Sequence, residues 1–304
     1  MTDLGTLKQI NAGQLSVAYY EAGPSDGAVA VLSHGFPYAP QSYARVVPRL
    51  TAKGLRVIVP FLRGYGPTRF LSDKTPRSGE QAALGADLLA LMNALQIHRA
   101  VLGGYDWGGR ASCVVAALWP ERVAGLVSCG CTSGYNIQDI ARSAEPAAPE
   151  LEASYWYQYY FHTERGVNGL TENRRGIGKL LWKMWSPNWA FDDATYDESA
   201  IAFDNPDFVD VVIHSYRHRY GIVPGDPSHA KIEAQLATQP EIPVPTIILQ
   251  GEDDTVDPSQ SQDTIARHFT GPYLRHLLPG IGHNPPQEAP EAFADAILKL
   301  AGIA

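Results

Sequence analysis

The chain has 304 residues, a formal net charge of −8 and a hydrophobic fraction of 45%. Such a chain can bury a sizeable core without disulfide or metal support. The acidic balance argues against a nucleic-acid partner, which would want a basic face, and against electrostatic attachment to anionic membranes. Three cysteines, Cys113, Cys129 and Cys131, give no disulfide framework and are expected to be buried as small hydrophobic residues.

The sequence also lacks the marks of export and membrane insertion. The N-terminal residues have neither the charged region nor the apolar region of a signal peptide, and no run of 18 apolar residues occurs. We therefore expect a cytoplasmic protein.

The first half of the chain alternates short apolar runs with helical patterns. Residues 14–22 alternate in hydrophobicity and predict an early antiparallel strand. The clearest helical spacing lies in residues 79–95. Buried strands are predicted at 28–32, 56–60, 100–104 and 123–129. This alternation is typical of an α/β fold, with a mostly parallel sheet covered by helices on both faces.

The alternation stops near residue 134. From there to about residue 240 the sequence is rich in aromatic residues and has helical patterns. Strand signals return at 245–249 and 273–278, before a final helix at 290–300. We predict a core of residues 1–133 and 241–304, with a helical cap of residues 134–240 inserted after the sixth strand.

The strand at 100–104 ends in the sequence GYDWGG, residues 104–109, and a helix is predicted from about 109 to 119. This is the nucleophile-elbow pattern of α/β-hydrolases, with Asp106 where serine is usual. The flanking positions must be small because a sharp turn from strand to helix crowds its neighbours. The helix N-terminus favours an anion at Asp106. Alone, the motif is also compatible with an aspartate that only caps a helix.

Two further segments supply partners for Asp106. His283 follows a late strand near the C-terminus, where this fold places its general base. An acidic loop follows the strand at 245–249, and Asp254 is the predicted acid of the triad. Asp257 and, more distantly, Asp139 are alternatives. The order nucleophile, acid, histidine is that of the α/β-hydrolase triad.

A loop directly after the strand at 28–32 reads His34-Gly35-Phe36-Pro37. The backbone N–H groups of Phe36 and Trp107 are predicted to form an oxyanion hole. We expect His34, Pro37 and Trp107 to lie beside the substrate. For His34, a structural hydrogen bond within the loop is the favoured role.

An aspartate nucleophile changes the reaction. A carboxylate is suited to displacement at a saturated carbon, which leaves an alkyl ester on the enzyme. His283, oriented by Asp254, would then activate a water molecule that attacks the carboxyl carbon of that ester. An epoxide leaves as an alkoxide and needs a proton donor, for which tyrosine is suited.

These motifs resemble the epoxide hydrolase branch of the α/β-hydrolase family. The resemblance rests on the HGFP loop, on the sequence RGYGPT at 63–68, and on the GYDWGG elbow, where histidine often stands in place of Tyr105. It implies hydrolysis of a small hydrophobic epoxide to a diol.

The resemblance also implies two tyrosines of the cap that activate the epoxide oxygen. Tyr157, in the sequence YQYYF, matches the first position, and Tyr216, in SYR, matches the second. Both tyrosines could instead belong to an aromatic cap core. Tyr159, Tyr160 and Tyr220 are the neighbours with which they are most easily confused.

Two other functions stay open. Dehalogenases share much of this core, and Arg110 resembles an arginine that binds the substrate carboxylate in haloacetate hydrolysis. Arg110 could equally be a helix arginine paired with a nearby carboxylate. A non-catalytic member that binds a small ligand is a further alternative. No motif indicates a cofactor or a metal, and a homodimer is compatible with the sequence.

Overall fold

The computed structural model describes residues 4–130, 134–259 and 262–303. Its nine-stranded sheet has the order β1-β2-β4-β3-β6-β7-β8-β9, with the short β5 paired to β2. The strands are β1 (Thr6–Ala12), β2 (Leu15–Ala22), β3 (Val29–Ser33), β4 (Arg56–Pro60), β5 (Arg69–Phe70), β6 (Ala100–Tyr105), β7 (Val123–Cys129), β8 (Thr246–Gly251) and β9 (Tyr273–Leu278).

The sheet is mostly parallel. β2 is antiparallel to β1, β4 and β5, whereas the pairs from β4 through β3, β6, β7 and β8 to β9 are all parallel. This topology confirms the predicted α/β-hydrolase fold. The long strands are those expected from the sequence, except β1, which was not predicted.

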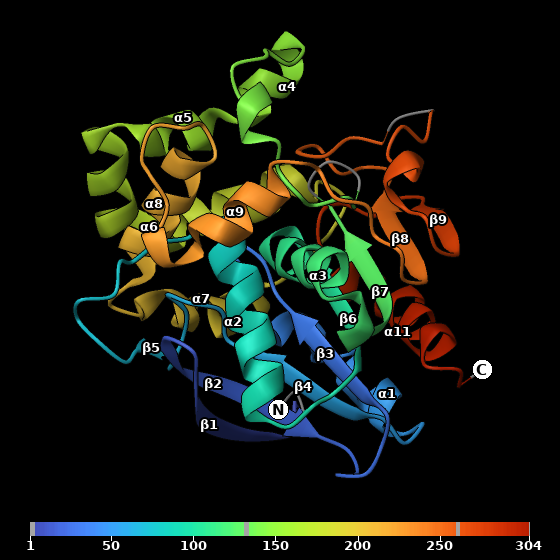
Figure 1. The fold of residues 1–304 in the computed structure, drawn as a ribbon. Coiled ribbons are helices and arrows are strands. Elements are labelled where there is room, and N and C mark those ends of the chain that lie inside the picture. Colours follow the sequence, from blue (N-terminus) through green and yellow to red (C-terminus); the bar gives the residue numbers. More distant parts are fainter. Residues whose placement is uncertain (1–3, 131–133, 260–261, 304) are drawn as a thin grey trace.

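Helices cover both faces of this sheet (Figure 1). A side chain at Gly103 would contact Phe293 and Ile297 of α11 (Pro290–Leu300), while one at Gly104 would collide with the first turn of α3 (Asp106–Leu118). Because successive residues of a strand point to opposite faces, α3 and α11 lie on opposite sides of the sheet. α2 (Gln81–Ala94) packs beside α3, and α1 (Val47–Thr51) packs beside α11.

Between β7 and β8 the described residues form helices and no strand. These are α4 (Pro149–Ser154), α5 (Trp156–His162), α6 (Glu164–Trp185), α7 (Asp193–Ala200), α8 (Phe208–His218) and α9 (Ala230–Leu236). In Figure 1, α4, α5, α8 and α9 lie beyond the end of the sheet to which the arrow of β7 points. The insertion follows the sixth strand when the two-residue β5 is left aside. The residue limits of core and cap stay a prediction.

Arg63 of the RGYGPT sequence is an internal anchor. Its guanidinium is fully buried and donates to both carboxylate oxygens of Asp87 in α2, at 2.6 and 2.8 Å. It also donates to the carbonyl and hydroxyl oxygens of Ser78. A planar guanidinium matches a carboxylate in this two-bonded geometry, so the loop after β4 is fixed to α2.

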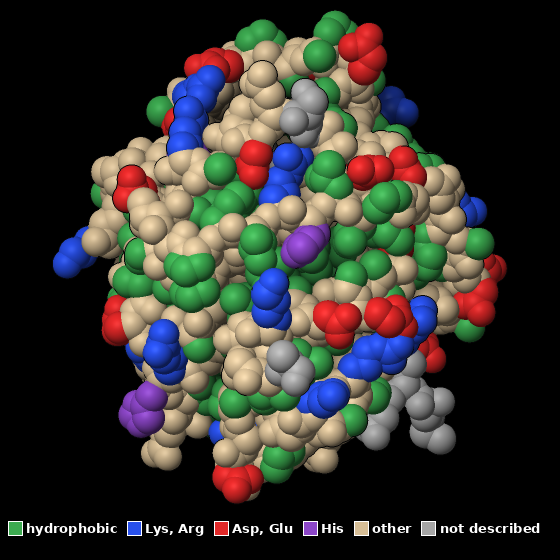
Figure 2. Space-filling view, turned by 90° about the vertical axis from the view of Figure 1, so that its right-hand side faces the viewer, with side chains coloured by type: hydrophobic (Ala, Val, Ile, Leu, Met, Phe, Trp, Pro, Cys, Tyr) green, Lys and Arg blue, Asp and Glu red, His purple; other side chains and the backbone are tan. Residues whose placement is uncertain are grey.

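The edge strand β9 leaves Leu274 and Leu277 about two-fifths exposed, at 42% and 41%. The side of the molecule to which β9 belongs carries hydrophobic side chains between interspersed acidic and basic ones (Figure 2).

Cys113 and Cys129 are free and buried, as expected, and Cys131 lies outside the described residues. Within the described ranges, no helix has both the length and the hydropathy needed to cross a bilayer.

Candidate active site

The chain turns sharply where β6 ends and α3 begins. Asp106 is the first residue of α3 and has a φ of 51°, in the left-handed region. The turn is crowded: a Cβ on Gly104 would lie 2.3 Å from the carbonyl oxygen of Gly108, and one on Gly108 would lie 1.9 Å from that of Ser33. Glycine is therefore required on both sides of Asp106, and α3 begins three residues earlier than the sequence suggested.

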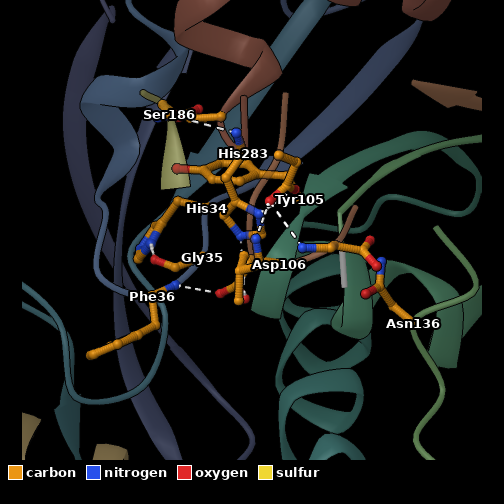
Figure 3. A network of polar contacts seen from close by, with 12 residues as sticks. His34, Gly35, Phe36, Tyr105, Asp106, Asn136, Ser186 and His283 are labelled. Atoms are coloured by element: carbon orange, nitrogen blue, oxygen red, sulfur yellow. Dashed lines mark hydrogen bonds and ion pairs between the residues drawn. The ribbon is translucent and has the colours of Figure 1, made fainter. Parts of the chain in front are cut away.

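The carboxylate of Asp106 faces the loop that follows β3. The backbone N–H of Phe36 donates to Oδ1 of Asp106 at 2.6 Å (Figure 3). A Cβ on Gly35 would lie 2.5 Å from the same oxygen, so only glycine lets this loop approach so closely. Trp107 follows Asp106 directly in the first turn of α3. Asp106 itself is 4% exposed, which keeps its carboxylate away from bulk water.

His283 lies above Asp106 on the loop between β9 and α10 (Pro285–Glu288) (Figure 3). Its Nδ1 is 2.7 Å from Oδ2 of Asp254, and its Nε2 is 3.8 Å from Oδ2 of Asp106. The carboxylate of Asp254 fixes Nδ1 as the protonated nitrogen. Nε2, which lies on the side of Asp106, can therefore accept a proton.

The acidic loop after β8 orients Asp254. Oδ1 of Asp254 accepts from the backbone N–H groups of Val256 and Asp257, at 2.9 and 3.0 Å. Of the acids considered from the sequence, Asp254 is the one that contacts His283. Asp257 donates its backbone N–H to the carboxylate of Asp254. Asp139 precedes a 3-10 turn of residues 140–142 in the segment after β7.

His34 is held by backbone groups on both sides of its ring. Its Nε2 accepts from Leu62 N at 3.2 Å, which leaves Nδ1 to donate to the carbonyl oxygen of Gly35 at 3.0 Å. Nε2 thus ties the loop after β3 to the loop after β4, while Nδ1 holds the ring within its own loop. Burial lowers the pKa of His34 to about 4, so the ring is neutral at physiological pH.

This buried histidine predicts an acid-dependent loss of stability. Below pH 6.5 His34 becomes protonated in the unfolded chain, whereas in the folded protein it stays neutral until the pH falls to about 4. The free energy of unfolding should therefore fall with the pH across this window, by about 3 kcal/mol from this residue.

Urea unfolding of the wild type and of His34→Gln at pH 7 and pH 4.5 measures the effect. The variant should be less stable at pH 7 but lose less on acidification, because other titrating groups are common to both proteins. Equal losses in the two proteins would contradict the prediction.

The ring of Phe36 sits at the centre of an aromatic cluster. Six rings have centroids between 5.4 and 6.4 Å from it, and five of them come from the segment between β7 and β8. They belong to Trp107, Tyr157, Phe161, Trp185, Phe208 and Tyr216. Phe36 thus connects the loop that contacts Asp106 to the inserted helices between β7 and β8.

Tyr157 and Tyr216 both belong to this cluster. Tyr157 lies on α5 and Tyr216 on α8, with ring centroids 5.3 Å apart and side chains almost fully buried. The hydroxyl of Tyr157 accepts from Nε2 of Gln158 at 3.0 Å, and the guanidinium of Arg219 stacks 4.2 Å from the ring of Tyr216. The structure therefore brings both predicted tyrosines to the Phe36 ring. In contrast, the hydroxyl of Tyr159 donates to Glu152 on the exposed side of α5.

Two further predicted residues have contacts of their own. The carbonyl oxygen of Pro37 accepts from the indole N–H of Trp182 at 2.8 Å. Arg110 is buried in α3, and its positive charge acts on Glu233 of α9. Burial raises the pKa of Glu233, whereas hydrogen bonds from the backbone N–H of Ala82 and from Gln81, and the charge of Arg110, oppose that rise. The role of Arg110 stays a prediction.

Sequence reasoning missed three residues around His283. The ring of Trp185 lies 5.0 Å from the imidazole, and Ser186 and Glu288 contact the backbone of the same loop. Trp185 and Ser186 lie almost a hundred residues before His283, at the end of α6, and no local pattern signals such a contact.

The chain is similar to known proteins over most of its length. Residues 31–290 match the family model described as alpha/beta hydrolase fold. Epoxide hydrolase A of Mycobacterium tuberculosis is 25% identical over 97% of both chains, and epoxide hydrolase B of the same organism is 30% identical over 49% of this chain and 44% of its own. A crystal structure of a candidate epoxide hydrolase from Klebsiella pneumoniae subsp. pneumoniae is 46% identical, covers 99% of both chains and has a TM-score of 0.95. The chain belongs to the alpha/beta hydrolase fold family, in its epoxide hydrolase branch.

Proposed function

We propose that this protein hydrolyses epoxides to vicinal diols through an ester on Asp106. The observation that carries the proposal is the setting of the Asp106 carboxylate. Oδ1 accepts from Phe36 N–H at 2.6 Å, while Oδ2 faces the imidazole of His283 at 3.8 Å. One oxygen is thus held by a backbone donor, and the other lies on the side of the proposed base. The names of the relatives support the same activity.

In the first step a carboxylate oxygen of Asp106 attacks one epoxide carbon. The carbon–oxygen bond of the ring breaks, and its electron pair stays on the epoxide oxygen. That oxygen needs a proton as it leaves, and the hydroxyls of Tyr157 and Tyr216 are the proposed donors. Both rings contact Phe36, so their position at the same end of the site supports this assignment.

In the second step His283 removes a proton from water, and the resulting hydroxide attacks the carboxyl carbon of the ester. The charge that develops on the carboxyl oxygen is stabilised by the N–H groups of Phe36 and Trp107. The ester bond then breaks, and the departing alkoxide takes up a proton to complete the diol. Asp106 keeps one oxygen atom from the water, and the remaining proton on the imidazolium restores the tyrosine that was deprotonated in the first step. Asp254 orients His283 and stabilises the imidazolium that forms.

Burial of the site supports this two-step chemistry. Asp106, Tyr157, Tyr216 and His283 are each no more than 4% exposed. Charges that develop inside such a site interact with nearby dipoles more strongly than they would in water. The aromatic rings around Phe36 favour a hydrophobic substrate. His34 and Pro37 belong to the same loop as Phe36, and their contact with the substrate stays a prediction.

A cytoplasmic location and a homodimer also stay predictions.

The function is tested with styrene oxide and aliphatic epoxides, with diol formation as the readout. One turnover in water labelled with heavy oxygen should place the label in Asp106 and leave the first diol unlabelled. Label in the diol from the first turnover would contradict the covalent route. Halide release from haloacetate or haloalkanes without epoxide turnover would instead establish the dehalogenase alternative, and binding without turnover of either class would favour the non-catalytic one.

A further inference from the structure

The backbone of His283 is held by a residue of the inserted helical segment. Ser186 caps the C-terminus of α6, and its hydroxyl oxygen accepts from His283 N–H at 3.0 Å (Figure 3). The same hydroxyl donates to Oε1 of Glu288 at 2.6 Å. Glu288 ends α10, so Ser186 joins the inserted segment, the histidine loop and the core helix in one hydrogen-bonded chain.

Glu288 holds this loop at two more points. Its Oε2 accepts from Gly282 N–H at 2.8 Å, and its Oε1 accepts from Asn284 N–H at 2.9 Å. Together with Ser186, the carboxylate therefore fixes the N–H groups of three consecutive residues, with His283 in the middle. All three contacts are made to the backbone, whereas Asp254 fixes the ring of His283.

The packing at this point is tight enough to require glycine. A Cβ on Gly282 would lie 2.5 Å from Cα of Ser186 and 2.6 Å from its hydroxyl oxygen. Ser186 is 1% exposed. Any displacement of the end of α6 would thus be passed directly to the histidine loop.

We propose that Ser186 and Glu288 are positioning residues that hold His283 for hydrolysis of the ester, so that the contact between the end of α6 and the histidine loop controls ester release and not ester formation. This inference rests on the proposed function. His283 acts only on the water of the second step, whereas ester formation needs Asp106 and a proton donor. The imidazole must hold that water in line with the carboxyl carbon, and a misplacement of about 1 Å can reduce such a rate about 10²-fold.

The test separates the two steps by rapid mixing with styrene oxide and mass spectrometry of the intact protein. In Ser186→Ala and Glu288→Gln, we expect ester formation to stay within about threefold of the wild type and ester hydrolysis to slow about 10- to 100-fold. The alkylated protein should then accumulate during turnover. Gly282→Ala keeps both polar side chains but would push Ser186 away from the histidine loop, and should change the same step.

Two variants serve as matched controls. Ser154→Ala removes a hydroxyl that donates to Leu151 of its own helix, and Glu291→Gln removes a carboxylate that pairs with Arg49 on the surface. Both should keep the wild-type ratio of the two rates. The inference is wrong if folded Ser186→Ala or Glu288→Gln slows neither step, or slows both equally. If Ser186→Ala does not fold, Glu288→Gln and Gly282→Ala decide by the same criterion.

Failure of the proposed function would look different. No variant, including His283→Ala, would then acquire an ester on Asp106. In that case the proton on Nδ1 of His283 gives an independent readout, because its low-field NMR signal reports the bond to Asp254. A shifted or broadened signal in Ser186→Ala, and not in Ser154→Ala, supports the positioning role, and an unchanged signal overturns it.

Discussion

An alanine at position 283 should leave a protein that forms the ester on Asp106 but scarcely releases it. The imidazole of His283 is the proposed base for the water of the second step, and its Nε2 faces Asp106 at 3.8 Å. We expect turnover to fall at least about 10³-fold, at the upper part of the range for general-base catalysis. Mass spectrometry of the Asp106 peptide should show the added mass of one substrate molecule.

Two further variants test the roles of Asp106 and Asp254 in the same reaction. Asp106→Asn should acquire no ester, because the nucleophile itself is lost. Asp254→Asn keeps the size of the side chain but weakens its hold on Nδ1 of His283, so some ester should accumulate. Diol release by His283→Ala at the wild-type rate, or no ester in that variant, would contradict the assignment of the base.

The double variant Tyr157→Phe with Tyr216→Phe should fail at the opposite step. Both rings keep their packing on Phe36, but neither can give a proton to the departing epoxide oxygen. General-acid catalysis contributes roughly 10²- to 10⁴-fold, so we expect ester formation to slow at least about 10³-fold when both donors are removed. The burst of ester measured by rapid mixing should disappear, and no alkylated protein should accumulate.

Tyr159→Phe is the matched control for this prediction. Its hydroxyl lies on the outer side of α5 and donates to Glu152, so its loss should leave the burst unchanged. A normal burst in the double variant would remove both tyrosines from the mechanism. A lost burst in Tyr159→Phe would instead show that the wrong tyrosine of α5 had been assigned.

Most of the sheet could be predicted because its inner strands β3, β4, β6, β7 and β8 are buried on both faces and therefore form short apolar runs. β4, β7 and β9 have the predicted limits, and β3, β6 and β8 differ from them by one or two residues. β1 was missed because it lies at the edge of the sheet and exposes most of its side chains. A strand that is held mainly by backbone pairing with β2 leaves little hydrophobic pattern in the sequence.

Some residues of the candidate site could likewise be predicted from the sequence, and others could not. Asp106, Asp254 and His283 follow the ends of strands, so their meeting at one edge of the sheet could be predicted from the strand pattern. The contact of Ser186 with His283 could not, because it depends on how the end of α6 packs on a loop 97 residues later in the chain. Residue type alone gives no hint of such a contact.

Phe36 has two roles, which limits how the site can be redesigned. Its backbone N–H donates to Asp106, the proposed nucleophile, while its ring packs against five rings of the inserted segment. Mutagenesis that trims this ring to admit bulkier molecules would also loosen the backbone donor. Phe161 and Phe208 offer rings without a polar group, so laboratory evolution towards larger epoxides should find its gains there.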